Sequence, residues 1–232
     1  MLNSTITIKI KQRLNKLDSN DYDNIECWQI VEAFNKAQVE WVRRQLHGGN
    51  QYKEGDEGST RRKDDLQVLL RDYELKLTDK KIFYISNVPQ NYLQWKRVDI
   101  ETTKDCCTNR KMIVYFAEEG DLSMLLRDAA KKPSFEWGET FATLMNNKIK
   151  IYNNEDFEIS KGSFTYYKQP EKIQILNCVD PYTNLASATE VLCEFKDDIV
   201  ELLIDEAVSI LAGDMESNNQ FARGSANAEK NN

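Results

Sequence analysis

Residues that could perform acid–base chemistry are scarce in this chain. The only histidine among the 232 residues is His47, which ends a helical stretch and precedes two glycines. A histidine in that position usually interacts with the last carbonyl groups of the helix and with its dipole. The sequence has no second histidine for a metal pair and no Gly-x-Ser-x-Gly nucleophile motif. We therefore expect no catalytic residue and no enzyme.

Two acidic clusters offer oxygen ligands for a divalent cation. Residues 118–121 read Glu-Glu-Gly-Asp, and residues 153–156 read Asn-Asn-Glu-Asp. Neither has the Asp-x-Asp-x-Asp-Gly spacing of a calcium loop, and acidic turns are common on acidic proteins. We expect no metal and no cofactor, and a metal-dependent enzyme that uses these clusters stays open as an alternative.

The cysteines do not predict a metal site or a disulfide. There are five of them, none in a Cys-x-x-Cys pair. Residues 1–10 lack the apolar core of a secretory signal, and disulfides are rare in proteins that are not exported, so we expect reduced thiols. No stretch approaches the roughly 18 consecutive apolar residues of a membrane helix, so we expect no membrane contact.

The charge of the chain argues against broad binding to nucleic acid. The net charge is −7 and the sequence pI is about 5.0, whereas phosphate binding needs clustered cations. Residues 164–167, which read Phe-Thr-Tyr-Tyr between two lysines, could stack bases. Their alternation favours a strand with one buried face. An acidic surface would suit a protein that DNA passes without binding.

Helical patterns lie at the two ends of the chain. Residues 24–45 place Trp28, Val31, Phe34, Ala37 and Trp41 on one apolar stripe, and residues 197–211 form a second amphipathic helix. A weaker helical pattern covers residues 6–17. The polar, glycine-rich residues 48–65 are typical of a mobile loop, and residues 214–232 of a flexible tail.

The centre of the chain changes to the alternating pattern of strands. Asn146 and Asn147 predict a hairpin turn between residues 139–145 and 148–152. Other expected elements are strands at 81–86, 111–117, 163–168 and 173–176, short helices at 89–98 and 121–130, and one or two helical turns at 64–70.

These patterns together predict an α+β fold. In it, the N- and C-terminal helices form a helical bundle that carries a central β-rich insertion. The predicted regions are residues 1–97, the β-rich insertion 98–176, the C-terminal helical region 177–213 and the flexible tail 214–232.

Several motifs occur in an order that points to a family. Residues 39–44 read Val-Glu-Trp-Val-Arg-Arg, residues 166–170 Tyr-Tyr-Lys-Gln-Pro, and residues 180–184 Asp-Pro-Tyr-Thr-Asn. The most specific motif is Ile-Val-Glu-x-x-Ile-Asp-Glu-Ala at residues 199–207, and Gln220 lies in the polar tail. Over most of its length the chain resembles the small virion proteins of tailed bacteriophages that form head-to-tail connector or adaptor rings, especially those of crAss-like phages.

The resemblance implies a structural protein of the virion neck or tail, assembled in the cytoplasm of the bacterial host. Such proteins form a homo-oligomer, here expected to be twelve-fold, beneath the portal protein and against neighbouring tail or ring proteins. DNA passes through the lumen without specific binding. An assembly factor that is absent from the finished virion is a second alternative.

The resemblance also implies that the C-terminal tail enters the portal. Within that tail, Gln220, Phe221 and Arg223 are the expected partner-binding residues. Phe221 would bury the largest apolar area, worth roughly 1.5–3 kcal/mol, and Arg223 would add a charge-assisted hydrogen bond at the edge of the same site.

Overall fold

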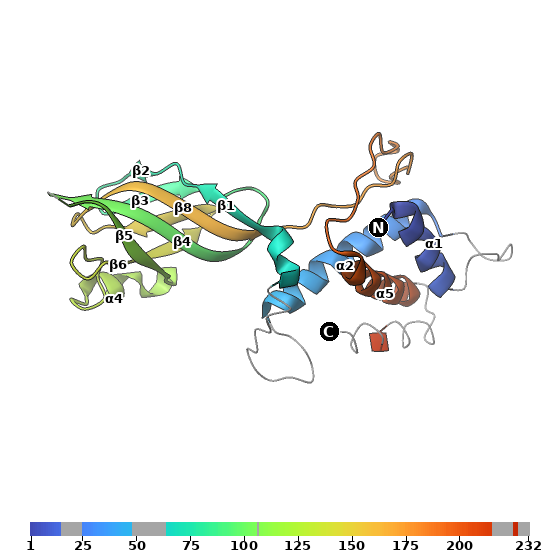
Figure 1. Ribbon diagram of the computed structural model, residues 1–232, viewed down its shortest axis with the longest axis horizontal. Helices are drawn as coiled ribbons and strands as arrows, with labels where there is room; N and C mark the ends of the chain where they lie inside the picture. The colour runs from blue at the N-terminus through green and yellow to red at the C-terminus, as the bar shows by residue number, and fades with distance from the viewer. Residues whose placement is uncertain (15–24, 48–63, 106, 215–224, 227–232) are drawn as a thin grey trace. The chain divides into compact units, whose positions relative to one another are not determined.

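The chain folds into two compact units. The computed structural model describes residues 1–14, 25–47, 64–105, 107–214 and 225–226, which are the coloured parts of Figure 1. Residues 1–68 and 170–232 belong to one unit, called here the helical unit. Residues 69–169 belong to the other, called here the sheet unit. The sheet unit is therefore one continuous stretch of chain set between two parts of the helical unit.

The sheet unit is built on an eight-stranded sheet with the order β1-β8-β4-β5-β6-β7-β3-β2. Neighbouring strands are antiparallel except β5 and β6, which run parallel and are joined through η2 and α4. The bounds are β1 Leu70–Glu74, β2 Thr78–Asp79, β3 Phe83–Asn87, β4 Tyr92–Lys104, β5 Cys107–Phe116, β6 Glu139–Met145, β7 Lys148–Tyr152, β8 Glu158–Lys168, η1 Gln67–Leu69, η2 Glu119–Asp121 and α4 Leu122–Arg127.

The sheet curls around an apolar core. β1 and β2 lie at opposite ends of the strand order, yet only residues 75–77 separate them in the chain. Such a short link spans roughly 3.3–3.6 Å per residue, so it draws the two ends of the sheet together. Leu75 and Leu77 also pack on Gly162 of β8, where an added Cβ atom would lie 3.1 Å from the Leu77 Cδ1 atom. Phe164, Ile149 and Ile151 are fully buried in the core.

The predicted hairpin between β6 and β7 is confirmed. Asn146 and Asn147 have φ values of 51° and 55°, which asparagine tolerates better than most residues. Strands at 83–87, 107–116 and 158–168 overlap the predictions for 81–86, 111–117 and 163–168. The inward-facing side chains of β8 include Phe164 and Tyr166, so this aromatic strand is part of the core.

Three helices of the helical unit pack together: α1 Asn3–Arg13, α2 Cys27–His47 and α5 Asp197–Asp214. α2 and α5 lie against each other, and α1 packs on α5. Trp41 of α2 meets Phe195, which precedes α5, in an edge-to-face contact with ring centroids 5.3 Å apart. No helix in the described ranges is long and apolar enough to cross a bilayer.

Charged side chains join α1 to α5. Lys9 and Arg13 both pair with Glu201, and Arg13 also pairs with Asp205 at 2.7 Å. Burial raises the pKa of Glu201, but its bonds to Lys9 and the charge of Arg13 outweigh this and leave the pKa below its ordinary value. Burial raises the pKa of Asp205, and the charge of Glu201 adds to that rise. The two neighbouring carboxylates thus have pKa shifts of opposite sign.

The prediction of a helical bundle with a β-rich insertion is wrong. The fold is mixed α/β, and its largest element is the curled eight-stranded sheet. Residues 89–98 were expected to be helical, whereas most of them belong to β4, which pairs with β8 along its length. Tyr92 packs on Phe164 with ring centroids 5.7 Å apart, so this contact with the core overrides the local pattern. Residues 173–176 form one isolated bridge instead of a strand.

Candidate functional site

An irregular hairpin connects β8 to α5 within the helical unit. Two antiparallel bridges define it, Gln174 with Val191 and Val179 with Ala186, and we call it the 174–191 hairpin. Backbone hydrogen bonds continue the pairing between the bridges, with Ser187 N–H donating to the Cys178 carbonyl at 2.8 Å. The two bridges share one register, and between them a turn at residues 176–177 lets the Asn177 N–H donate to the Ser187 carbonyl at 3.0 Å.

The tip of the hairpin is a hydrogen-bonded turn organised by Asp180. Its carboxylate accepts the Tyr182 N–H at 2.9 Å and the Thr183 hydroxyl at 3.1 Å. Its carbonyl accepts the N–H of Asn184 at 2.8 Å, and Asn184 has a φ of 55°. This turn presents Tyr182 and Leu185, whose exposed fractions are 80% and 70%. Two large apolar side chains are therefore held outward by a fixed backbone.

Side chains from both neighbouring helices hold the base of the hairpin. Asn3 of α1 is buried and donates from Nδ2 to the carbonyls of Gln174 and Val191, at 2.9 and 3.0 Å. Asn35 of α2 accepts the Ile173 N–H at 2.8 Å. One asparagine thus spans both arms of the hairpin, and the other fixes the residue just before it.

A disulfide provides a further link between the hairpin and α2. Cys27 at the start of α2 is bonded to Cys178, with 5.8 Å between their Cα atoms. The expectation that all thiols are reduced is therefore wrong for this pair. The two cysteines are 151 residues apart, and no local pattern in the sequence indicates that the fold brings them together.

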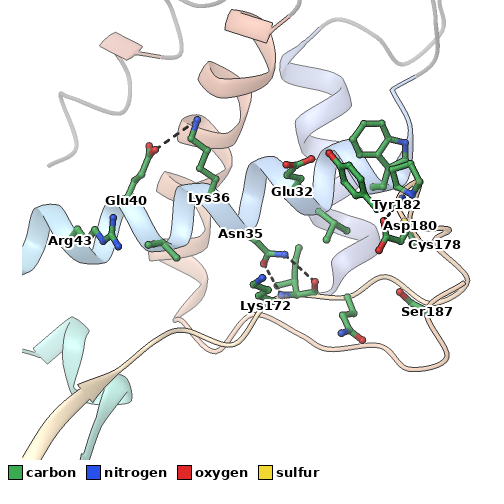
Figure 2. A pocket seen from close by; sticks show the side chains of 16 residues that line it. Glu32, Asn35, Lys36, Glu40, Arg43, Lys172, Cys178, Asp180, Tyr182 and Ser187 are labelled. Atoms are coloured by element: carbon green, nitrogen blue, oxygen red, sulfur yellow. Dashed lines mark hydrogen bonds and ion pairs between the residues drawn. The ribbon is translucent and has the colours of Figure 1, made fainter. Parts of the chain in front are cut away.

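A groove with a volume of about 600 Å³ runs between α2 and the hairpin (Figure 2). Its apolar lining includes Trp28, Val31, Val39 and Ile173. Charged side chains stand along α2 at its rim: Glu32, Lys36, Glu40 and Arg43. Lys36 and Glu40 are 4.0 Å apart, with side chains 59% and 41% exposed. An apolar floor with charged rims is suited to binding a protein segment.

The structure corrects the expected stripe on α2. Phe34, Ala37 and Trp41 are buried as expected. Trp28 and Val31 are only half-buried and line the groove instead. Trp28 and Val31 lie at one edge of the stripe. Their position at the edge was the sequence signal that could have indicated a second, partly exposed apolar face.

The residues predicted to bind the portal lie outside the described part of the chain. Gln220, Phe221 and Arg223 all belong to residues 215–224, so the tail site stays a prediction. Of the residues that follow, Ser225 is described, and its hydroxyl lies 3.0 Å from that of Ser209 on α5.

The acidic clusters contribute ion pairs to the sheet unit. Glu119 pairs with Lys150 at 2.8 Å, and this hydrogen bond is the main reason that the pKa of Glu119 is lowered. Asp156 pairs with Lys104 and accepts the Phe135 N–H at 2.7 Å. Within the described ranges, no three His, Cys, Asp or Glu side chains are grouped so that they could hold a metal ion.

Tyr182 and Leu185 were not singled out as binding residues from the sequence. Their signal was the string Asp-Pro-Tyr-Thr-Asn at residues 180–184, which has the composition of a turn. An apolar side chain in a turn motif is exposed by the geometry of the turn. Comparison with known proteins finds no family model and no curated protein that matches this chain.

Proposed function

We propose that this chain is a structural virion protein, a subunit of the head-to-tail connector ring that joins portal and tail around the DNA channel. The observation that supports this most is the 174–191 hairpin, which holds Tyr182 and Leu185 outward on a hydrogen-bonded turn. A hydrogen-bonded loop with exposed large apolar side chains is suited to contact with another protein.

The construction of the hairpin suits a permanent joint. Ordering a loop and its side chains on binding costs free energy, and a loop that is already fixed avoids most of that cost. Asn3, Asn35 and the Cys178 disulfide fix the loop before any partner arrives. Tyrosine is also among the residues that contribute most at protein interfaces.

The motifs behind the family resemblance lie in two places of the helical unit. Residues 180–184 form the tip of the hairpin, and residues 199–207 lie in α5, which is packed against α2. The motifs that carry the resemblance therefore lie both in the exposed tip of the 174–191 hairpin and in α5, a packed helix of the same unit. The net charge of −7 is in keeping with a channel that DNA passes without binding.

The first test is the composition of purified virions from the phage that encodes this chain. Quantitative mass spectrometry should find the chain in intact particles, in a fixed ratio to the portal protein. Presence in infected cells with absence from particles would replace the proposal with the assembly factor. Divalent metal that stays bound to the purified chain after dialysis would favour the enzyme.

The second test is binding to the portal protein of the same phage. The double variant Tyr182→Ser with Leu185→Ser should bind at least about tenfold more weakly, because both exposed apolar contacts are lost. Met124→Ser is the matched control, since Met124 is 58% exposed on α4 of the sheet unit. Equal portal binding by the double variant and the control would show that the hairpin does not contribute to the contact with the portal.

A further inference from the structure

The rim of the groove on α2 has a regular order of charges. Four charged residues follow one another with alternating sign, and they are Glu32, Lys36, Glu40 and Arg43. At 100° and 1.5 Å per residue they fall within an arc of about 80° and a length of about 16 Å. We call them the α2 charge strip. Figure 2 shows them along one side of the helix.

The charge strip lies beside a partly apolar strip of the same helix. The side chains of that second strip are half-buried, and they are Trp28, Val31, Asn35 and Val39. By the same helical geometry they occupy the neighbouring arc of about 80°. Glu32 and Arg43 have no ion-pair partner among the residues that the structure describes. The two strips together form one face of α2, whose partly apolar side borders the hairpin through the bond between Asn35 and Ile173.

The charge strip is complementary to itself when its direction is reversed. Read forwards its signs are minus, plus, minus, plus, and read backwards they are plus, minus, plus, minus. A two-fold axis perpendicular to α2 places the α2 helix of a second copy antiparallel to the first. Each side of the contact surface then faces the same side of the other helix, so the charge strip faces the charge strip. Glu32 then faces Arg43 of the second copy, and Lys36 faces Glu40 of the second copy. Every facing pair along the strip is of opposite charge.

We propose that two copies of this chain associate through this face of α2, antiparallel and related by a two-fold axis. A parallel pair would set the charge strip of each copy against the partly apolar strip of the other and leave its four charges without opposite partners across the contact. In the antiparallel pair, Val39 and its symmetry mate lie near the axis. The charge strips of the two copies then lie against each other along one edge of the contact.

This contact is separate from the proposed ring. A two-fold contact uses one patch twice and closes at two copies, whereas neighbours in a twelve-fold ring meet through two different patches. The α2 pair therefore belongs to the free chain. It does not depend on the function proposed above, and the experiment below contains no portal protein.

The test uses sedimentation equilibrium of the purified full-length chain at low salt. The wild-type chain should dimerise, and added salt should weaken the dimer because the facing charges are screened. Lys36→Glu and Glu40→Lys each create two like-charged facing pairs, so each variant should dimerise at least about tenfold more weakly. Lys76→Glu, an exposed charge reversal on the sheet unit, is the matched control and should dimerise like the wild type.

Mixing the two variants tests whether complementary charges restore the pair, which a variant that had merely lost its fold could not do. In a heterodimer, one chain has glutamate at positions 36 and 40 and the other has lysine at both. Both facing pairs of residues 36 and 40 are then of opposite charge, so heterodimers should form with about wild-type affinity. The doubly exchanged chain, Lys36→Glu with Glu40→Lys, should dimerise again for the same reason. A monomeric wild-type chain, single variants that dimerise as tightly as wild type, or a mixture without heterodimers would overturn the proposal.

Discussion

The sheet unit and the helical unit are stabilised by different kinds of contact. The core of the sheet unit is one continuous apolar cluster, in which strands paired along their length bury Phe164, Ile149 and Ile151. Both units contain ion pairs, but the helical unit also has the Cys27–Cys178 disulfide, and its ion pairs of α1 with α5 join segments at opposite ends of the chain. We therefore expect that single links of the helical unit can be removed one at a time, whereas a cavity in the sheet core weakens the strands packed around it.

The largest effect is expected from a cavity in the sheet core. Phe164→Ala should lower the free energy of unfolding of the sheet unit by about 3–5 kcal/mol, because the side chain is fully buried. Its ring packs on those of Tyr92 and Tyr166, with centroids 5.7 and 5.6 Å away. Hydrogen exchange resolved by residue should show lost protection in β4 and β8 and little change in α2 and α5.

The control for that cavity is an exposed side chain of the same sheet. Ile113→Ala removes apolar atoms from a residue that is 57% exposed, so it should change stability by no more than about 0.5 kcal/mol. Equal losses of protection in both units with Phe164→Ala would show that the two units unfold together, and would contradict the view that they are stabilised separately.

The second effect concerns the disulfide of the helical unit. Replacing both Cys27 and Cys178 with alanine should destabilise that unit by about 2–4 kcal/mol, because a long loop of the unfolded chain is no longer closed. Exchange should rise in the 174–191 hairpin and the first turns of α2, while β4 and β8 keep their protection. A loss confined to the sheet unit would contradict this assignment of the link.

The third effect is a pH dependence of the contact between α1 and α5. The folded pKa of Glu201 lies below its ordinary 4.5, so the stability it contributes is present above that value and is lost as the pH falls through the lowered pKa. The raised pKa of Asp205 has the opposite sign and offsets part of this loss. With Glu201 34% exposed, the net change should be about 1 kcal/mol or less.

That pH dependence can be isolated with one variant. Glu201→Gln keeps the shape of the side chain and removes its titration, so the acid-induced loss of protection in α1 should shrink. Lys80→Gln, an exposed change on the sheet unit, should leave the pH profile of α1 as it is in wild type. A profile that is identical with and without the Glu201 carboxylate would exclude this ion pair as its source.

The sequence predicted those elements that are defined by local periodicity. α2 and α5 were found from helical spacing, and the hairpin of β6 and β7 from alternation around Asn146 and Asn147. β1 was not predicted because it is short and partly charged, and because its partner β8 lies about 90 residues further along the chain. The predicted architecture was wrong for the same reason, since a short stretch of sequence does not indicate which distant strands pair with each other.

The candidate site was even less accessible from the sequence. Its groove needs α2, Ile173 and the disulfide to come together, and each of these contacts joins residues more than 130 positions apart. The turn at residues 180–184 was recognisable as a string of turn-forming residues. That Asn3 and Asn35 hold the base of the hairpin that carries this turn was not predictable, because both contacts join residues far apart in the chain.

The smallest effect on stability is expected from removal of residues 218–232. In the described part of that segment, the Ser225 hydroxyl bonds to Ser209 at 3.0 Å, so the loss should be no more than about 1 kcal/mol. Portal binding should nevertheless be strongly weakened if Phe221 anchors the tail, and Phe221→Ala should reproduce most of that loss in a folded chain. Circular dichroism checks the fold, and calorimetry with purified portal measures the binding. Unchanged binding by the truncated chain would exclude the tail and leave the 174–191 hairpin as the remaining candidate for the joint.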